Sequence, residues 1–590
     1  MHKISSLQSR LFAFSILFPI SSLSLSCVTS GKSSSVVNTD AGNATCELPK
    51  KRYAWSASKP PKLVWLSLDS LNQAGLEEIA GQLRNPHPRG LKWILQSQNK
   101  NPHLTVREPT ITSSSHISTI SCSTAEVHGI YANSQWNGSK MVSGFNSPFA
   151  SETFATTLKN SGLKVVTAAY PALDNSESGR QVNEGFAYGD TFGRSQIHVT
   201  CNNQPLVHAW NDPNGNLIEE ITFKGNDVSE TQNFSCRKNK CIFENSAVKN
   251  TVDVTVSTTQ QKFRAYVQQL PGEKRQVYIS PLAANKSFPE NVRKFQDDCG
   301  AIFSPGKDHS LASFGPEQLI RGFEHRLSHF DWNWAYYLPS TNADVIFLYL
   351  EDIDALRHQY SGDTQARDAV ARHYERVDAV VGNFLASLPA STNVIVLGDH
   401  GMSTISKELN VRKILPARAL EDSHIVTSGG TLMLYGRKSQ ANSMSASPSA
   451  IELEWLQSTK DQLTKFKLPD EDNLVFRKVF IKGTDGMKEA GLAHPNAPFL
   501  IAFANENYAL QNAMTDELIL GDITDPKKPA PRPRGQHGHA QESARMKTFL
   551  AGWGPVVDSI RLSEVKTNID LVPTLGKAFA WQIPPQCRSK

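Results

Sequence analysis

The sequence predicts an α/β fold with a central, mostly parallel β-sheet and helices on both faces. Short apolar runs of strand length, such as residues 62–69 and 344–354, alternate with segments of helical periodicity along most of the 590 residues. Residues 175–305 differ, because polar and apolar side chains alternate there between turns rich in Asn, Gly and Pro. This second pattern is typical of an insertion built from β-strands.

The expected elements follow the first strand in chain order. Before the insertion we expect helices at residues 76–83, 91–98, from about 113, and 152–162, then a strand at 163–171. After the insertion we expect a strand at 344–354, a long helix at 365–388, strands at 391–402, 429–436, 474–483, 498–505 and 547–555, and a closing helix at 568–579.

The predicted domain organisation has five parts. Residues 1–26 resemble a signal peptide, and the polar residues 27–60 are expected to form a flexible tether. The α/β domain is expected in two parts, at 61–174 and 306–590. Residues 175–305 between them are the β-rich insertion, which we interpret as a cap on this domain.

The leader indicates an extracytoplasmic protein. Lys3 and Arg10 precede and flank an apolar run, and the small residues before Cys27 resemble a loose bacterial lipobox. The protein is therefore expected to be secreted, periplasmic, or anchored to a membrane by lipid on Cys27. The formal net charge of +5 comes without a basic stripe, so we expect no binding to nucleic-acid duplexes. The sequence gives no prediction of oligomeric state.

The eight cysteines fit an oxidising compartment. If Cys27 carries lipid, seven remain, and at least one of these must be a free thiol. Cys122 is the candidate for the free thiol, because it lies in a segment that we interpret as a packed core element. We hypothesise disulfides between Cys46 and Cys587 and between Cys236 and Cys241, among 15 possible connectivities of the other six.

A Ser/Thr cluster at residues 112–115 lies between Pro109 and a segment of small and β-branched residues. Such residues offer N-caps for a helix that begins near residue 113. A hydroxyl at a helix N-terminus also lies where backbone N–H groups and the dipole favour negative charge. The cluster is therefore interpreted either as an ordinary helix cap or as the place of an oxygen nucleophile that attacks phosphorus.

Acidic residues and histidines collect where predicted strands end. They are Asp69, Asp354, His358, Asp399, His400 and His537. In an open α/β sheet the carboxyl ends of the strands meet at one crevice, so these side chains are expected to converge there with Thr112. Each one alone is also common as a turn residue or as a solvated helical pair, so the prediction depends on their conjunction. Mixed Asp and His ligands favour Zn²⁺ or Mn²⁺ over Ca²⁺ and Mg²⁺.

Two motifs then identify a family. The chain carries P-T-I-T at residues 109–112 and H-G-I-Y-A-N at residues 128–133. These resemble the P-T-x-T and H-G-I-x-x-N motifs of the alkaline phosphatase superfamily, in its nucleotide pyrophosphatase/phosphodiesterase (type I phosphodiesterase) branch. Residues 568–570 and 573–575, N-I-D and P-T-L, also resemble the C-terminal signature of that family.

The resemblance implies an alkaline phosphatase-like fold and a site with two Zn²⁺ ions, or Mn²⁺ in their place. It implies one metal on Asp354, His358 and His537, and the other on Asp69, Thr112, Asp399 and His400. It also implies that Thr112 is the nucleophile, that hydrolysis passes through a phospho-threonyl intermediate, and that Asn133 contacts the phosphate. His116 and His128 are interpreted as structural, because no metal-ligand role is implied for them.

The implied activity is hydrolysis of a small phosphoric diester or pyrophosphate. A phosphomonoesterase or phosphonate hydrolase and a catalytically inactive binding relative remain the alternatives. Ser113 stands where relatives that act on nucleotides often have an aromatic residue, and Tyr170, Trp136 and Trp334 are the candidates to replace it. The stretch 165–179 lacks the Lys and Arg that monoesterases of the family use, which favours a diester.

Overall fold

The computed structural model describes residues 54–149, 151–173, 178–186, 188, 316–436, 447–531 and 534–589, and the backbone of nine strands between residues 194 and 281. The leader, the tether and Cys27 lie outside the described residues. In the described part of the chain, every helix is too short or too polar to span a lipid bilayer.

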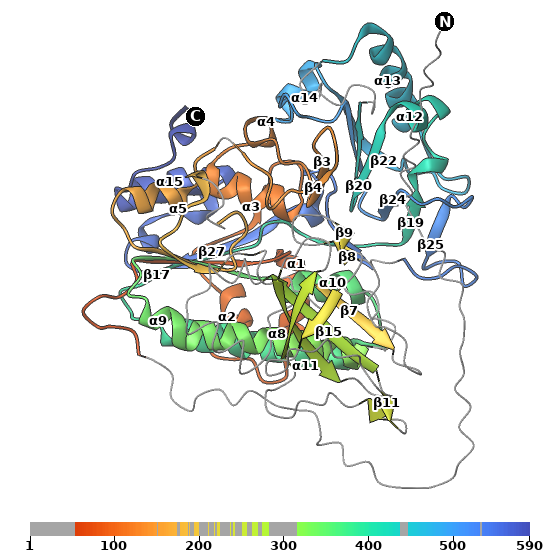
Figure 1. Ribbon diagram of the computed structural model, residues 1–590. Helices are drawn as coiled ribbons and strands as arrows, with labels where there is room; N and C mark the ends of the chain where they lie inside the picture. Colours follow the sequence, from red (N-terminus) through yellow and green to blue (C-terminus); the bar gives the residue numbers. More distant parts are fainter. Residues whose placement is uncertain are drawn as a thin grey trace, which may run out of the picture.

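A seven-stranded sheet forms the centre of the molecule (Figure 1). Its order is β2 (Lys100–Leu104), β27 (Thr548–Trp553), β17 (Asn393–Leu397), β1 (Leu63–Leu68), β16 (Val345–Leu350), β5 (Val165–Ala168) and β6 (Glu184–Phe186). The five strands from β17 to β6 are parallel, and β27 and β2 are antiparallel at one edge. The predicted, mostly parallel α/β sheet is therefore confirmed.

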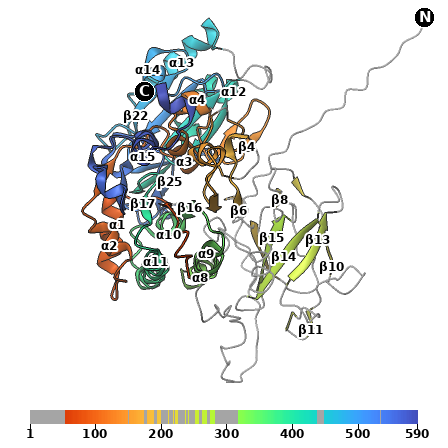
Figure 2. The same ribbon diagram turned by 90° about the vertical axis from the view of Figure 1, so that its left-hand side faces the viewer.

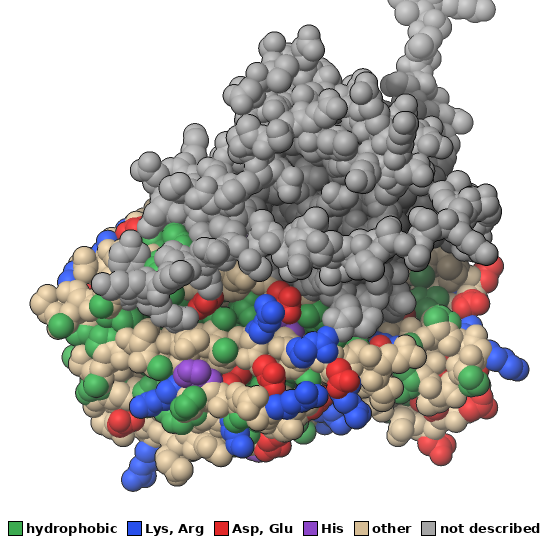
Figure 3. Space-filling view, turned by 90° about the horizontal axis from the view of Figure 1, so that it is seen from below, with side chains coloured by type: hydrophobic (Ala, Val, Ile, Leu, Met, Phe, Trp, Pro, Cys, Tyr) green, Lys and Arg blue, Asp and Glu red, His purple; other side chains and the backbone are tan. Residues whose placement is uncertain are grey.

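Helices cover both faces of this sheet, which explains why its middle strands are apolar on both sides. On one face lie α3 (Thr112–Ser121), α5 (Phe154–Asn160) and α15 (Leu571–Phe579), and on the other lie α1 (Gln73–Gln82), α2 (Leu91–Leu95), α8 (Pro316–Trp332), α10 (Asp352–Tyr360) and α11 (Arg367–Ser387) (Figures 1 and 2). Every residue of β1, β16 and β17 is buried. The face seen from below carries interspersed basic and acidic side chains in its described part (Figure 3).

Helix α3 is buried along its whole length, although most of its residues are polar. Its small side chains allow this close packing, and internal hydroxyls donate to carbonyls one turn earlier, as in Thr119 Oγ1 to Ser115 O at 2.7 Å. The expected hydroxyl cap is absent, because Ile111 occupies the N-cap position and Thr112 is the first helical residue. The Thr112 hydroxyl is thus left for other contacts.

A second, smaller lobe follows β17. Its four-stranded antiparallel sheet has the order β20 (His424–Ser428), β21 (Thr431–Tyr435), β23 (Leu500–Ala504) and β22 (Phe476–Ile481). Three further strands, β24 (Tyr508–Gln511), β19 (Lys407–Asn410) and β25 (Ile519–Asp522), form another sheet beside it, with α12 (Ala417–Asp422), α13 (Ala450–Leu463) and α14 (Asp485–Glu489). The strands expected at 429–436, 474–483 and 498–505 therefore belong to a separate sheet with its own apolar core.

The strands between residues 194 and 281 include an antiparallel sheet in the order β10 (Ile221–Lys224), β13 (Thr251–Val256), β14 (Lys262–Gln269), β15 (Lys274–Pro281) and β7 (Arg194–Val199). It lies to one side of the α/β body in Figure 2. Short strands β11 (Cys236–Arg237) and β12 (Lys240–Cys241) pair Cys236 with Cys241 across a two-stranded ribbon. The side chains of both cysteines, and so the hypothesised disulfide between them, lie outside the described residues. The domain boundaries at 175 and 305 stay a prediction.

One disulfide corrects the expectation for Cys122. Cys122 is bonded to Cys587, with the two Cα atoms 5.3 Å apart, so it is not a free thiol, and the hypothesised Cys46–Cys587 pair is wrong. Cys122 is the C-cap of α3 and has φ = 52°, a left-handed conformation that favours Gly. The bond therefore ties the end of the helix that begins with Thr112 to the C-terminal turn.

We expect reduction of this disulfide to lower the thermal stability of the protein. The cross-link joins residues 465 positions apart, and loss of a native disulfide typically costs about 2–5 kcal/mol. Thermal unfolding of the wild type with and without reductant measures this loss of stability. A Cys122→Ser/Cys587→Ser variant is measured beside it, and reductant should have a smaller effect on that variant. Equal unfolding temperatures for oxidised wild type and double variant would contradict the expectation.

Candidate metal centre and nucleophile

Three neighbouring parallel strands place the acidic residues at one edge of the sheet. Asp69 follows β1, Asp354 lies just beyond β16, and Asp399 follows β17, and β1 pairs with both other strands. The Asp69 N–H donates to Leu350 O at 2.9 Å, which fixes the end of β1 against the end of β16. The convergence expected from the sequence is therefore produced by the sheet itself.

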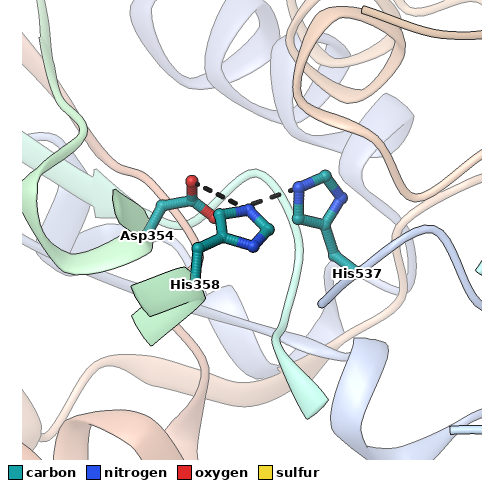
Figure 4. A group of neighbouring side chains, drawn as sticks. All are labelled: Asp354, His358 and His537. Atoms are coloured by element: carbon teal, nitrogen blue, oxygen red, sulfur yellow. Dashed lines mark ion pairs between the residues drawn. The ribbon is translucent and has the colours of Figure 1, made fainter. Parts of the chain in front are cut away.

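Asp354, His358 and His537 form the first group (Figure 4). Asp354 and His358 lie one turn apart on α10, and His358 Nε2 is 3.3 Å from Asp354 Oδ2, while His537 Nε2 is 4.0 Å from Asp354 Oδ1. The other ring nitrogen of each histidine faces a backbone carbonyl: His358 Nδ1 lies 2.6 Å from Gly535 O, and His537 Nδ1 lies 3.2 Å from Thr110 O. With Nδ1–H donating to a carbonyl, each ring presents Nε2 to the same point, the usual orientation of metal-binding histidines.

The second group surrounds His400 Nε2. Thr112 Oγ1 and Asp399 Oδ2 each lie 3.1 Å from this nitrogen, and Asp69 Oδ1 lies 3.6 Å from it. Ligand atoms of Asp69, Asp354 and His400 also lie within 4.8 Å of one another. The structure thus brings together all seven residues predicted as ligands, and Asp354 takes part in both groups.

The charges of this cluster are unbalanced without a cation. Burial, and then the carboxylates of Asp399 and Asp354, raise the pKa of Asp69 well above its ordinary value. Asp69 Oδ1 and Asp399 Oδ2 are buried, and among the described residues neither accepts a hydrogen bond of good geometry. Burial also acts to raise the pKa of Asp354, but His358 and His537 outweigh it and hold that pKa far below its usual range.

These donors fit a divalent cation. Buried carboxylate oxygens without hydrogen bonds need positive charge nearby, and neutral imidazole nitrogens suit Zn²⁺ or Mn²⁺. His537 meets this requirement, because burial and the neighbouring His400 lower its pKa well below the ordinary value. The donor set therefore matches the kind of site that the sequence predicts.

Thr112 and Asn133 meet at the N-terminus of α3. Thr112 is 3% exposed, and the Ser113 N–H donates to Asn133 Oδ1 at 2.9 Å. Because this bond uses the oxygen of the amide, the Nδ2 group is the part of the Asn133 side chain that can donate. Asn133 is therefore hydrogen-bonded to the backbone of Ser113, the residue directly after the predicted nucleophile Thr112.

The two histidines interpreted as structural have different surroundings. His128 is buried, its Nε2 lies 2.9 Å from Ser118 Oγ, and burial lowers its pKa to about 3, so it stays neutral. His116 lies one turn after Thr112 with Nδ1 2.8 Å from Thr112 O and 3.3 Å from Asp399 Oδ2. His116 thus contacts two predicted site residues, Thr112 and Asp399. Its position one turn after the predicted nucleophile is the signal in the sequence that could have indicated these contacts.

Two further residues donate hydrogen bonds to predicted ligands, although no sequence motif indicates them. The buried Tyr349 on β16 donates to Asp69 Oδ2, and Ser70, which directly follows Asp69, donates to Asp354 Oδ1. Tyr349 lies between Leu348 and Leu350 in a continuously apolar strand, so the sequence indicates only a core aromatic residue. Only the pairing of β1 with β16 shows that its hydroxyl reaches a site residue.

The surroundings of Ser113 explain why a small residue stands there. A Cβ on Gly144 would lie 2.9 Å from Ser113 Oγ and 2.0 Å from Ala132 O, so the loop after Asn133 packs directly on this side chain. Of the three candidate aromatics, Tyr170 and Trp334 are fully buried in the core. Trp136 is only partly buried and stacks on His424, with ring centroids 3.8 Å apart.

The sequence also matches the family model of the type I phosphodiesterases / nucleotide pyrophosphatases over residues 63–540. The chain belongs to this family. The phosphodiesterase match spans the whole interval from Asp69 to His537, and thus every predicted site residue. The chain is accordingly a hydrolase of the phosphodiesterase/pyrophosphatase type, and the resemblance noted in its motifs is confirmed.

Solved structures of two members of the phosphodiesterase family are similar to the chain. They are murine and human ectonucleotide pyrophosphatase/phosphodiesterase 5, each with 13% sequence identity and with 89% of this chain and 96% of that chain covered. Their TM-scores are 0.48 and 0.49, respectively. A search of curated proteins returned no match.

Proposed function

We propose that this phosphodiesterase-family protein is an extracytoplasmic two-zinc hydrolase of phosphoric diesters or pyrophosphates that acts through a phospho-threonyl intermediate. The observation that supports it best is the position of Thr112 Oγ1, 3.1 Å from His400 Nε2 and beside two groups of potential metal ligands. A hydroxyl in that position at a helix N-terminus has the surroundings that an oxygen nucleophile for phosphorus requires.

In this proposal one zinc is held by Asp354, His358 and His537, and the other by Asp69, Thr112, Asp399 and His400; Mn²⁺ is the alternative ion. Bound ions would supply the positive charge that stabilises the attacking and leaving oxygens. Thr112 Oγ1 forms the bond to phosphorus while the bond to the leaving-group oxygen breaks. Water then hydrolyses the threonyl phosphate and restores the hydroxyl.

In this proposal Asn133 donates a hydrogen bond to a non-bridging oxygen of the phosphate. Its Oδ1 accepts from the Ser113 N–H, so the Nδ2 group is the part that donates to substrate. Asn133→Asp keeps the acceptor for Ser113 but replaces the donor with a negative oxygen. We expect kcat/KM to fall by about 100- to 1,000-fold, the usual loss for one such donor.

Asn137→Asp is the matched control for this change. Asn137 lies four residues away in a hairpin turn, and its Oδ1 accepts from the N–H groups of Ser139 and Lys140. An aspartate preserves both bonds there, so turnover should stay within about twofold of wild type because surface changes of this kind are nearly neutral. A normal rate for Asn133→Asp would remove Asn133 from the proposal.

The diester preference is proposed from the residues after β5. The basic residue that ends this stretch, Arg180, is buried and donates to the backbone carbonyls of Phe145 and Ser147. Its charge is thus directed at the loop 145–149 and not at the nucleophile. A site without an added cation for the second charge of a monoester discriminates in favour of diesters.

A side-by-side assay with bis(p-nitrophenyl) phosphate and p-nitrophenyl phosphate tests this preference. We expect a higher kcat/KM for the diester, and a dinucleoside pyrophosphate should be cleaved as well. A preference for the monoester would replace the proposal with a phosphomonoesterase. A phosphonate monoester as the best substrate would indicate a phosphonate hydrolase.

Localisation outside the cytoplasm is proposed from the leader at residues 1–26 and from the Cys122–Cys587 disulfide, which needs an oxidising compartment. Cys27 is the proposed lipid attachment site if the protein is membrane-anchored. The insertion at 175–305 is proposed to act as a cap on a catalytic domain formed by 61–174 and 306–590. Mass spectrometry of the mature N-terminus would show whether cleavage occurs before Cys27 and whether that residue carries lipid.

A further inference from the structure

Ser70 has an unusual backbone conformation at the end of β1. It follows Asp69, is fully buried, and has φ = 59°. L-amino acids other than Asn and Asp seldom adopt this left-handed region, whereas Gly enters it without steric cost. A buried serine that keeps such a conformation points to a use for its hydroxyl that Gly could not serve.

The contacts of Ser70 reach both groups of predicted ligands. Its Oγ donates to Asp354 Oδ1 at 2.5 Å and lies 3.3 Å from His400 Nδ1. Its N–H donates to Asp399 Oδ1 at 3.1 Å. One residue therefore touches one predicted ligand of the first metal, Asp354, and two of the second, Asp399 and His400.

The hydroxyl has no competing role in the local turn. Helix α1 is capped by Asn72, whose side chain accepts from the Gly75 N–H at 2.8 Å. The carbonyl of Ser70 accepts from Arg357 Nη1 at 3.0 Å, which holds the backbone of the turn independently of the side chain. Both described contacts of the hydroxyl are thus with predicted metal ligands.

We propose that Ser70 is a positioning residue of the two-metal centre. Its hydroxyl fixes the orientation of the Asp354 carboxylate, and with it the direction of the oxygen that this residue offers to the metal shared with His358 and His537. Hydrogen bonds to metal-ligating side chains orient them and typically change metal affinity by about 10- to 100-fold when they are removed. This inference depends on the proposed two-zinc function.

The test compares Ser70→Ala with Ser70→Gly. Both variants lose the hydroxyl, but only Gly relieves the left-handed backbone, so the pair separates the side chain from the conformation. Zn²⁺ is titrated into the metal-free full-length protein against a chromophoric chelator, and the unfolding temperature of each metal-free variant is measured. We expect Zn²⁺ affinity to fall by about 10- to 100-fold in both variants, with Ser70→Gly at least as heat-stable as Ser70→Ala.

Ala580→Gly is the matched control. Ala580 is an exposed C-cap residue of α15 with φ = 53°, so Gly relieves the same conformation at a position that bears no metal ligand. This variant should gain heat stability without any change in Zn²⁺ affinity.

The outcomes separate this inference from the function on which it depends. Wild-type Zn²⁺ affinity in both Ser70 variants would overturn the positioning role, even with a working hydrolase. A loss of affinity in Ser70→Ala alone would assign the effect to the backbone and also overturn it. A wild-type protein that binds no Zn²⁺ would instead contradict the proposed two-zinc function.

Discussion

Replacing Thr112 with Ala should remove nearly all hydrolytic activity while the protein remains folded. Thr112 Oγ1 lies 3.1 Å from His400 Nε2, and the proposed reaction forms its new bond to phosphorus at this atom. We expect kcat to fall at least about a thousandfold, which corresponds to about 4 kcal/mol of activation free energy. Steady-state assays and circular dichroism of the purified variant measure the two parts of this expectation.

Thr119→Ala is the control for the loss of a buried threonine in the same helix. Thr119 is buried and its Oγ1 donates to Ser115 O, two turns away from the site. This variant should be less stable than wild type but should turn over substrate normally. If Thr112→Ala retains wild-type rates, the nucleophile lies elsewhere; if the wild type itself hydrolyses no ester tested, the inactive-relative alternative gains support.

Removing the metal should have an effect of similar size. We expect excess chelator to abolish hydrolysis and added Zn²⁺ to restore it, because in the part of the chain that the structure describes the carboxylates of Asp69 and Asp399 have only histidines as possible cationic partners. Asp354→Asn should reproduce the loss genetically. Since Asp354 is a proposed ligand of one zinc and lies beside Asp69 and His400 of the other, we expect this variant to bind less than the full complement of metal and to lose more activity than the ~100-fold typical of a supporting residue.

Asp378→Asn is the matched control for Asp354→Asn. Asp378 is buried more deeply than the partly buried Asp354, and its carboxylate accepts from the backbone N–H groups of His87 and Leu91, outside the site. Metal analysis by mass spectrometry should give wild-type zinc content for this control. Full turnover of the wild type in excess chelator would refute the two-metal proposal, whatever the variants show.

The architecture was predictable because strand-length apolar runs and helical segments alternate clearly. The same logic placed the acids and histidines, since residues that end neighbouring parallel strands must lie close together. The antiparallel pairing of β27 with β17 and with β2 was not predictable, because the residues of a strand do not show the direction in which it runs in the sheet. Helix α8 was missed although Ile320, Phe323, Leu327 and Phe330 have helical spacing and are all buried.

The errors at Cys122 and the omission of Ser70 have a common physical cause. Each residue acts through a partner that is far away in the chain, Cys587 in one case and Asp354 in the other. Each also has a left-handed backbone, which local composition does not reveal for a residue other than Gly. Sequence patterns indicate periodicity and turns, but they do not show contacts between residues far apart in the chain. Those contacts are seen only in the folded structure.

The position of Asp354, a proposed ligand of one ion beside ligands of the other, has a consequence for how the ions would load. Two cations whose ligands lie within 4.8 Å of one another cannot bind independently, because the first to arrive changes the charge and the carboxylate orientation that the second meets. By thermodynamic linkage the influence is reciprocal, so each ion alters the affinity of the other by the same factor. A Zn²⁺ titration of this protein should therefore not fit a model of two independent sites, and the enzyme would gain activity only as the pair fills.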